Sequence, residues 1–231
     1  MKTNYRMRRG FTLVELLVVI VIIAALAGLT APMVIRQRKK ADQTEAVNNA
    51  RQIGIALMEF ETEYGTFPDS STADTVATNT ATTKVSGNTA NDRFRQMVRA
   101  GIAQSEPMFY SKTSYTKKPD GIITNEKDLE KGEVGFGMMV KADDTGLSGA
   151  GNPSRPILLT PFDSGLTGEK FDFDPYDGKA VVWRLDSSVT SIAIIKATGK
   201  IKISGEDLTA SSTNSVWGTD TAVKVSYPLS K

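Results

Sequence analysis

The feature that most constrains this chain is a long apolar run close to its N-terminus. Fourteen consecutive apolar or small residues occupy positions 16–29, and only Thr30 and Pro32 interrupt the pattern from there to residue 35. A helix needs about 20 mostly apolar residues to cross a bilayer. The segment 11–35 is therefore long enough to span a membrane, and Glu15 is its one charged residue.

Glu15 limits the ways in which the apolar segment can be interpreted. A carboxylate costs roughly 2.5 to 3.5 kcal/mol near the centre of a bilayer, and less near its surface, so it requires a partner or a function. A plain membrane anchor, a signal peptide cleaved at Ala25-Leu26-Ala27 and a twin-arginine address at Arg8-Arg9 all fit the basic start and the apolar run. None of the three explains Glu15.

Residues 8–17, Arg-Arg-Gly-Phe-Thr-Leu-Val-Glu-Leu-Leu, resemble the cleavage motif of type IV pilins and type II secretion pseudopilins. The resemblance implies that residues 1–10 are a basic leader, that prepilin peptidase cuts between Gly10 and Phe11, and that Phe11 is then N-methylated. It also implies a function in protein secretion or piliation. The chain would be a structural subunit of a type IV pilus-like or type II secretion pseudopilus filament, assembled through a helix over residues 11–35.

Cleavage would also give Glu15 a partner. A cut after Gly10 creates an ammonium group on Phe11, and N-methylation keeps that charge, so a neighbouring subunit displaced along a filament could present it to the carboxylate. The resemblance assigns Glu15 to this pairing between subunits. In the alternative interpretation, Glu15 lies at the membrane surface beside a helix N-terminus, where the helix dipole favours a negative charge.

Pro32 lies four residues after Gly28, and a helical proline removes the hydrogen bond to the carbonyl four residues back. We expect a kink between Gly28 and Pro32. The resemblance implies that the helix bends or melts between Gly28 and Pro32 during filament packing. The simpler alternative is that these residues mark the boundary between the membrane helix and the soluble helix.

The charges that flank the apolar segment do not decide its orientation. Four basic residues precede it and four follow it, so the positive-inside rule is balanced. The resemblance implies a cytoplasmic leader and a single pass through the inner membrane, with the rest of the chain on the outer side and a periplasmic or extracellular filament after assembly. It further implies four kinds of partner: other pilin or pseudopilin subunits, prepilin peptidase, an inner-membrane assembly platform and membrane lipid.

The membrane helix is predicted to continue outward as an amphipathic helix within residues 36–68. Apolar residues recur there at alternating steps of four and three, the pattern of a helix with one buried face: Ala46, Ala50, Ile53, Leu57, Phe60 and Tyr64. Gly65 is placed as the C-terminal cap, and Pro68 prevents the helix from resuming. Residues 63–68 resemble the segment that follows the long helix in many major pseudopilins.

Residues 69–231 are predicted to form an α+β globular domain in which the amphipathic helix packs on a small antiparallel sheet, the general pilin plan. The Ser/Thr-rich stretch 70–90 is expected to be a surface loop, and Asn91 to open a short helix. Short β-prone runs follow: 134–140, 157–160, 180–185, 191–196, 200–203 and 222–227. The turn at 197–199 is predicted to join 191–196 and 200–203 into a hairpin with Ile201 and Ile203 inward.

Composition excludes several classes of function. The chain has no Cys and no His, which removes thiolate and imidazole catalysis and ordinary zinc sites, and no other catalytic motif is present, so we expect no enzyme. Residues 172–178 fail as an EF-hand and residues 204–221 are poor in acids, so no metal or other cofactor is expected. The small net charge of +2 argues against nucleic acid. The remaining alternative is a membrane-anchored extracytoplasmic binding module that does not polymerise.

Overall fold

The computed structural model describes residues 11–231 except 86, 125, 126 and 220. The predicted leader, with Gly10, lies outside the described residues. The chain divides into two compact units, Met1–Arg38 and Lys39–Lys231. Each is described by itself.

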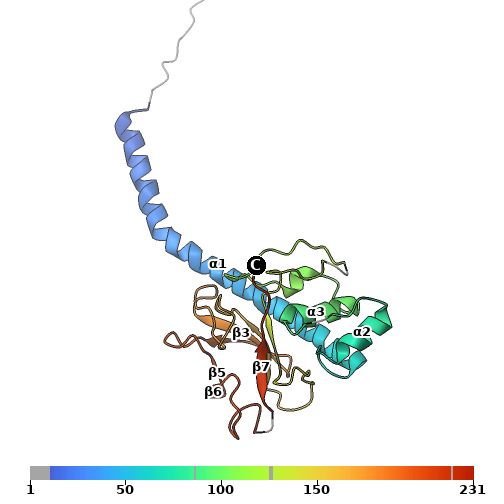
Figure 1. Cartoon of the computed structure of the whole chain (residues 1–231). Helices are drawn as coiled ribbons and strands as arrows, with labels where there is room; N and C mark the ends of the chain where they lie inside the picture. The colour runs from blue at the N-terminus through green and yellow to red at the C-terminus, as the bar shows by residue number, and fades with distance from the viewer. Residues whose placement is uncertain (1–10, 86, 125–126, 220) are drawn as a thin grey trace, which may run out of the picture. The chain divides into compact units, whose positions relative to one another are not determined.

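A single α-helix, α1 at Leu13–Tyr64, contains 52 residues and contributes to both units (Figure 1). In the first unit, all described residues from 11 to 38 are exposed. This part of α1 is long and apolar enough to cross a membrane, and none of its most apolar stretch is buried within the chain. The predicted apolar helix is therefore present.

The helix remains continuous at Pro32. Two residues earlier, the Thr30 hydroxyl donates hydrogen bonds to the carbonyl oxygens of Leu26 at 3.0 Å and Ala27 at 3.3 Å. Such back-bonding from threonine often bends a helix slightly. A kink between Gly28 and Pro32 remains a prediction.

In the second unit, the C-terminal half of α1 buries one face. The buried residues are Ala46, Asn49, Ala50, Ile53, Gly54, Ala56, Leu57 and Phe60, which confirms the predicted apolar stripe apart from Tyr64, only partly buried at the last position. The helix ends as expected at Gly65, which has a φ of 85° and donates its N–H to the Glu61 carbonyl at 2.7 Å.

The sheet has five antiparallel strands in the order β4-β3-β2-β1-β7 (Figure 1). These strands are β1 at Gly137–Lys141, β2 at Pro156–Thr160, β3 at Lys179–Arg184, β4 at Val189–Ala193 and β7 at Val223–Ser226. The central strands β1, β2 and β3 are almost completely buried, as expected for strands covered on both faces. The predicted α+β class, with a long helix packed on a small antiparallel sheet, is confirmed.

The stretch 70–90 differs from the expected surface loop, because helix α2 occupies Thr72–Thr80. The Asp69 carboxylate accepts hydrogen bonds from the backbone N–H groups of Ser71 and Thr72, both at 2.7 Å, and so starts the first turn. Ala73 and Val76 are buried. The buried side chains of Ala73 and Val76 and the carboxylate of Asp69 therefore stabilise a short helix in a sequence that is otherwise too polar to build a core.

The next helix, α3 at Ala90–Arg99, was expected to open at Asn91 and begins one residue earlier. Thr89 caps it: the Thr89 hydroxyl accepts from the Asp92 backbone N–H, and the Asp92 carboxylate accepts from the Thr89 backbone N–H. A short 3-10 helix, η1 at Glu106–Phe109, follows.

The hairpin predicted at 197–199 is present only as a turn closed by one antiparallel bridge, and the predicted pairing of 191–196 with 200–203 is otherwise wrong. Strand β4 pairs with β3, and only an isolated bridge joins Ile195 to Lys200. The Gly199 carbonyl accepts from the Phe171 N–H at 2.7 Å, so the chain is drawn away from β4 after the turn. Residues 202–207 instead form a separate two-stranded ribbon, β5 at Lys202–Ile203 with β6 at Glu206–Asp207. The predicted burial of Ile201 and Ile203 is nevertheless confirmed.

Candidate functional site at the start of the long helix

Two polar side chains meet at the first turn of α1. The Thr12 backbone N–H donates to Glu15 Oε2 at 2.8 Å, and the Thr12 hydroxyl donates to the same oxygen at 2.7 Å. In return, the Glu15 backbone N–H donates to Thr12 Oγ1 at 3.2 Å. Since α1 begins at Leu13, Thr12 is the N-cap and Glu15 the third helical residue, which is the arrangement of a capping box.

The capping box gives Glu15 a role within its own chain that the sequence interpretation missed. The signal was present, because Thr-x-x-Glu before an apolar run is the known pattern. The hydrogen bonds use Oε2 alone, and among the described residues Oε1 accepts none. Within the described part of the chain, this second carboxylate oxygen is therefore available to another partner.

The other predicted site residues lie apart from this pair. Phe11 is 82% exposed and precedes the helix. Gly28 and Pro32 lie on α1 more than three turns further along, and a Cβ built on Gly28 would meet no atom within 4 Å. The structure therefore brings Thr12 and Glu15 together. Among the described residues, Phe11, Gly28 and Pro32 have no tertiary neighbours.

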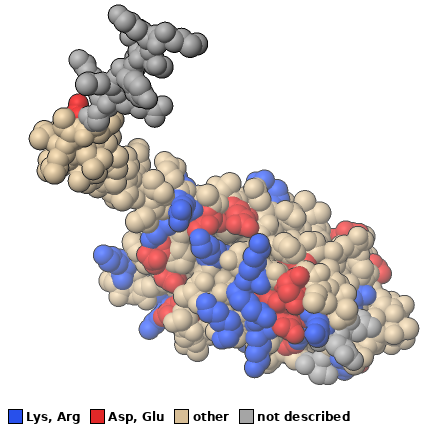
Figure 2. Space-filling model, turned by 90° about the horizontal axis from the view of Figure 1, so that it is seen from above, with Lys and Arg blue, Asp and Glu red and all other residues tan. Residues whose placement is uncertain are grey.

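Beyond Glu15, α1 presents a continuous apolar surface. Together with the residues that precede Glu15, the large apolar side chains of the first unit are all exposed, by 46% or more: Phe11, Leu13, Val14, Leu16, Leu17, Val18, Val19, Ile20, Val21, Ile22, Ile23, Leu26, Leu29, Met33, Val34 and Ile35. In Figure 2 most of the first unit is free of charged side chains, whereas charges of both signs are spread over the second. Exposed apolar surface of this extent requires a membrane or another apolar helix to cover it.

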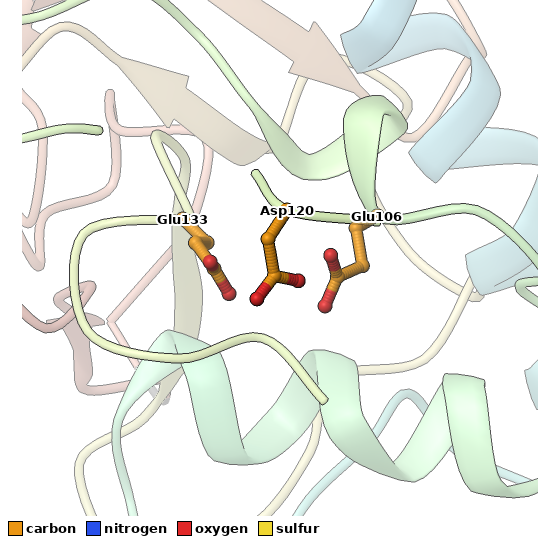
Figure 3. Close-up of side chains that lie close together, drawn as sticks. All are labelled: Glu106, Asp120 and Glu133. Atoms are coloured by element: carbon orange, nitrogen blue, oxygen red, sulfur yellow. The ribbon is translucent and has the colours of Figure 1, made fainter. Parts of the chain in front are cut away.

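A second cluster of chemical groups lies in the globular unit. The carboxylates of Glu106, Asp120 and Glu133 point toward one another, with one oxygen of each within 4.8 Å of the others (Figure 3). Glu106 and Glu133 are buried and Asp120 is exposed. No pattern in the sequence indicates this cluster, because the three residues lie far apart along the chain and form no motif.

The chain already supplies these carboxylates with partners. Glu106 accepts from the backbone N–H groups of Leu129 at 3.1 Å and Gly121 at 2.8 Å, and the Lys117 ammonium lies 3.3 Å from Glu133 Oε1. Burial raises the pKa of Glu106, and the nearby Glu133 carboxylate adds to the rise. The described contacts therefore link Gly121 and Leu129 to Glu106, and Lys117 to Glu133, and we assign the cluster to the fold.

Comparison with known proteins identifies the N-terminal segment. Residues 5–31 match the family model described as the prokaryotic N-terminal methylation motif. The chain is 28% identical over 175 residues to type II secretion system core protein G of Dickeya chrysanthemi, a match that covers 64% of this chain and 99% of the relative.

Two further relatives match over a shorter segment. The core protein G of Pectobacterium carotovorum subsp. carotovorum is 37% identical over 67 residues, which is 29% of this chain and 42% of the relative. The core protein G of Escherichia coli (strain K12) is 39% identical over 61 residues, which is 26% of this chain and 42% of the relative. The chain thus spans less than half the length of these two relatives. No solved structure matches the chain significantly.

Proposed function

We propose that this chain is a structural subunit of a pseudopilus-like filament, because its residues 5–31 match the prokaryotic N-terminal methylation motif and it is similar to type II secretion system core protein G. Prepilin peptidase removes residues 1–10, and the remaining chain assembles through α1. The protein acts by polymerising and not as an enzyme.

One observation carries this proposal: α1 combines an uncovered apolar surface with a single carboxylate at its start. In a bilayer, lipid covers such a helix. In a filament, the same surface packs against the helices of other copies, where close side-chain contacts replace those with lipid. A head-to-tail contact that does not close on itself generates a helical filament, the form expected of a pseudopilus.

Glu15 supplies the specific part of this packing. Cleavage after Gly10 leaves an ammonium group at Phe11, four residues and about 6 Å along the helix axis from Glu15. A neighbouring copy displaced by a short distance along the axis brings its Phe11 ammonium to the free Oε1 of Glu15. The capping box holds the carboxylate in place for that partner, because Thr12 fixes Oε2 from two donors.

Before assembly, the chain is held by α1 in the inner membrane as a single-pass protein. The globular unit Lys39–Lys231 lies on the extracytoplasmic side, and the leader is cytoplasmic, where the peptidase requires it. The partners are other subunits, the peptidase, the inner-membrane assembly platform and lipid. The apolar length of α1 supports the membrane part of this proposal.

The test is to co-express the chain with a complete type II secretion machinery, shear the cells and sediment the filaments. The wild-type chain is expected in the filament fraction, and Gly10→Trp is expected to remain as uncut precursor in the membrane. Gly28→Ala is the control for processing, because it also changes a glycine near the N-terminus but lies far from the Gly10-Phe11 bond, so this variant should be cut normally. A wild-type chain that is cut but stays monomeric in the membrane would instead favour an anchored binding module.

A further inference from the structure

Four basic residues follow directly on the apolar segment of α1: Arg36, Arg38, Lys39 and Lys40. Helix α1 is continuous through these positions. At about 1.5 Å per residue, their Cα atoms lie within about 6 Å of one another along the helix axis. One headgroup layer of a bilayer is about 5 to 8 Å thick, because a bilayer of about 40 to 45 Å contains a hydrocarbon core of about 30 Å. The four residues therefore fit within a single headgroup layer.

The four side chains leave the helix in different directions. Each residue is turned by about 100° from the one before, so relative to Arg36 the turn is about 200° at Arg38, about 300° at Lys39 and about 40° at Lys40. We call these four residues the basic girdle. A protein partner covers one side of a helix, whereas lipid headgroups surround it. Charges on three sides of α1 therefore fit a lipid surface better than a second copy of the chain.

Most of the girdle has no partner within the chain. Arg36, Arg38 and Lys40 are exposed, and no ion pair involves them in the part of the chain that the structure describes. Lys39 is the exception, because its ammonium lies 2.6 Å from the Asp174 carboxylate. Three cations of the girdle are thus available to an anionic partner.

Acidic side chains close to the girdle do not cancel its charge. Asp42 pairs with Lys112 at 2.9 Å. Residues 170–179 together with Lys196, which lies over an aromatic ring of that segment, carry three basic and three acidic side chains and are neutral as a group. Glu45 has no ion pair among the described residues either, but it lies about 8 Å past Lys40 along the helix axis, outside the headgroup layer.

We propose that the basic girdle binds the phosphate groups of anionic phospholipids in the leaflet on the side of the globular unit. The inference rests on the part of the proposed function that inserts α1 in a membrane, and not on polymerisation. Each Lys or Arg near an anionic surface strengthens attraction to it by about fivefold. A zwitterionic headgroup attracts the girdle less, because its own ammonium group offsets the phosphate.

This contact also sets the depth of α1. Glu15 precedes Arg36 by 21 residues, which is about 32 Å along a straight helix, and the hydrocarbon core is about 30 Å thick. With the girdle in one headgroup layer, Glu15 therefore reaches the opposite surface of the core, where a carboxylate costs less than at its centre. Assembly into a filament must then pull the girdle out of the headgroups, so anionic lipid retains the free subunit in the membrane.

Native mass spectrometry tests the lipid preference. The full chain is purified in detergent and mixed with equal amounts of phosphatidylglycerol and phosphatidylcholine that have the same acyl chains. We expect the wild type to carry about tenfold more phosphatidylglycerol than phosphatidylcholine. In the triple variant Arg36→Gln, Arg38→Gln and Lys40→Gln, this ratio should fall about fivefold or more. Every variant keeps the same leader, so the difference comes from the girdle.

The matched control removes the same number of charges from the globular unit. Lys118→Gln, Lys131→Gln and Lys202→Gln change three exposed lysines, and the lipid ratio should stay within about twofold of the wild type. Arg36→Lys with Arg38→Lys keeps the charges and should keep the ratio. Raising the salt from about 0.1 M to about 1 M shortens the Debye length from about 10 Å to about 3 Å, so the wild-type ratio should fall about threefold or more.

The outcomes separate this inference from the proposed function. A wild-type chain that binds both lipids equally, or an equal fall in the girdle variant and the control variant, overturns lipid binding by the girdle and leaves the filament subunit in place. A chain that prefers phosphatidylglycerol through the girdle but forms no filaments overturns the filament subunit alone.

Discussion

Gly54 of α1 lies directly against the indole ring of Trp183 on β3. A Cβ built on Gly54 would be 2.1 Å from Trp183 Cε2 and 2.2 Å from Nε1, well inside any allowed contact. Trp183 is 1% exposed, so its ring is enclosed by other residues of the core. The absence of a side chain at Gly54 therefore sets how closely the helix approaches the sheet.

Gly54→Ala is expected to destabilise the globular unit. Alanine gains about 1 kcal/mol in helix propensity over glycine, but overpacking of a filled core costs about 1 to 3 kcal/mol, and here the obstacle is a rigid buried ring. The net effect should be a loss of about 1 kcal/mol or more. Denaturation of the full chain in detergent, followed by tryptophan fluorescence, measures it.

Trp183→Leu provides the control for this prediction. Trp183 Nε1 has no hydrogen-bond partner among the described residues, so leucine removes no hydrogen bond while it removes the ring atoms that a methyl group at position 54 would meet. In the Trp183→Leu background, Gly54→Ala should cost little or should stabilise. An equal loss in both backgrounds would show that the contact with the indole ring is not the cause.

The raised pKa of Glu106 predicts how stability depends on pH. Burial favours the protonated form, so the contribution of Glu106 to stability is greatest below its unfolded pKa of about 4.5 and is lost as pH rises through the folded value. Glu106→Gln does not titrate. The free energy of unfolding of the wild type minus that of the variant should therefore fall as pH rises from about 4 to about 8. A difference that rises over this range would contradict the assignment.

Calcium is expected to have little effect on stability. Glu133 already has Lys117 as a cationic partner, and residues 204–221 hold few acids. A ligand that binds only the folded state raises the free energy of unfolding in proportion to the logarithm of its excess over the dissociation constant, and the melting temperature rises with it. A clear rise in excess calcium that disappears in Glu133→Gln would overturn this prediction and locate a cation at the carboxylate cluster.

Processing should remove ten residues and leave a methylated Phe11 at the new N-terminus. The match of residues 5–31 to the methylation motif is the basis of this expectation. Mass analysis of the N-terminal peptide of the mature chain tests it. A chain that starts at Gly28 would instead indicate a signal peptidase acting after Ala27.

Local patterns in the sequence were sufficient to predict α1. Its apolar run and its stripe of 3.6-residue period are properties of neighbouring residues. Gly65 ends the helix because its φ is 85°, an angle that glycine adopts readily. The capping box of Thr12 and Glu15 is equally local, with its pattern readable from four residues. This capping box, which the structure adds to the proposed site, could therefore have been predicted from the sequence.

The features that the sequence did not predict depend on contacts between distant residues. The carboxylate cluster joins Glu106, Asp120 and Glu133, which are distant along the chain. Similarly, β4 pairs with β3 and not with the segment after the turn, because the Phe171 N–H takes the Gly199 carbonyl. The alternation of side chains along a strand predicts which of them are buried, but it does not identify the neighbouring strand.

The proposed function depends most on the charge of Glu15. The two roles of Glu15, which are to cap its own helix and to pair with the Phe11 ammonium of a neighbouring copy, can be separated. Glutamine at the third helical position still forms a capping box, so Glu15→Gln keeps the helix start but loses the charge, whereas Glu15→Ala loses both. Neither change touches the core of the globular unit, so both variants should fold and insert into the membrane. Both should be cut after Gly10.

The decisive measurement is the amount of Glu15→Gln subunit that enters filaments when it is co-expressed with tagged wild-type chain and the filaments are pulled down. If Glu15 pairs with the Phe11 ammonium of a neighbouring copy, incorporation should fall at least tenfold, to about the level of Glu15→Ala. Incorporation of Glu15→Gln equal to that of the wild type would show that the carboxylate only caps its own helix, and would contradict assembly through this ion pair.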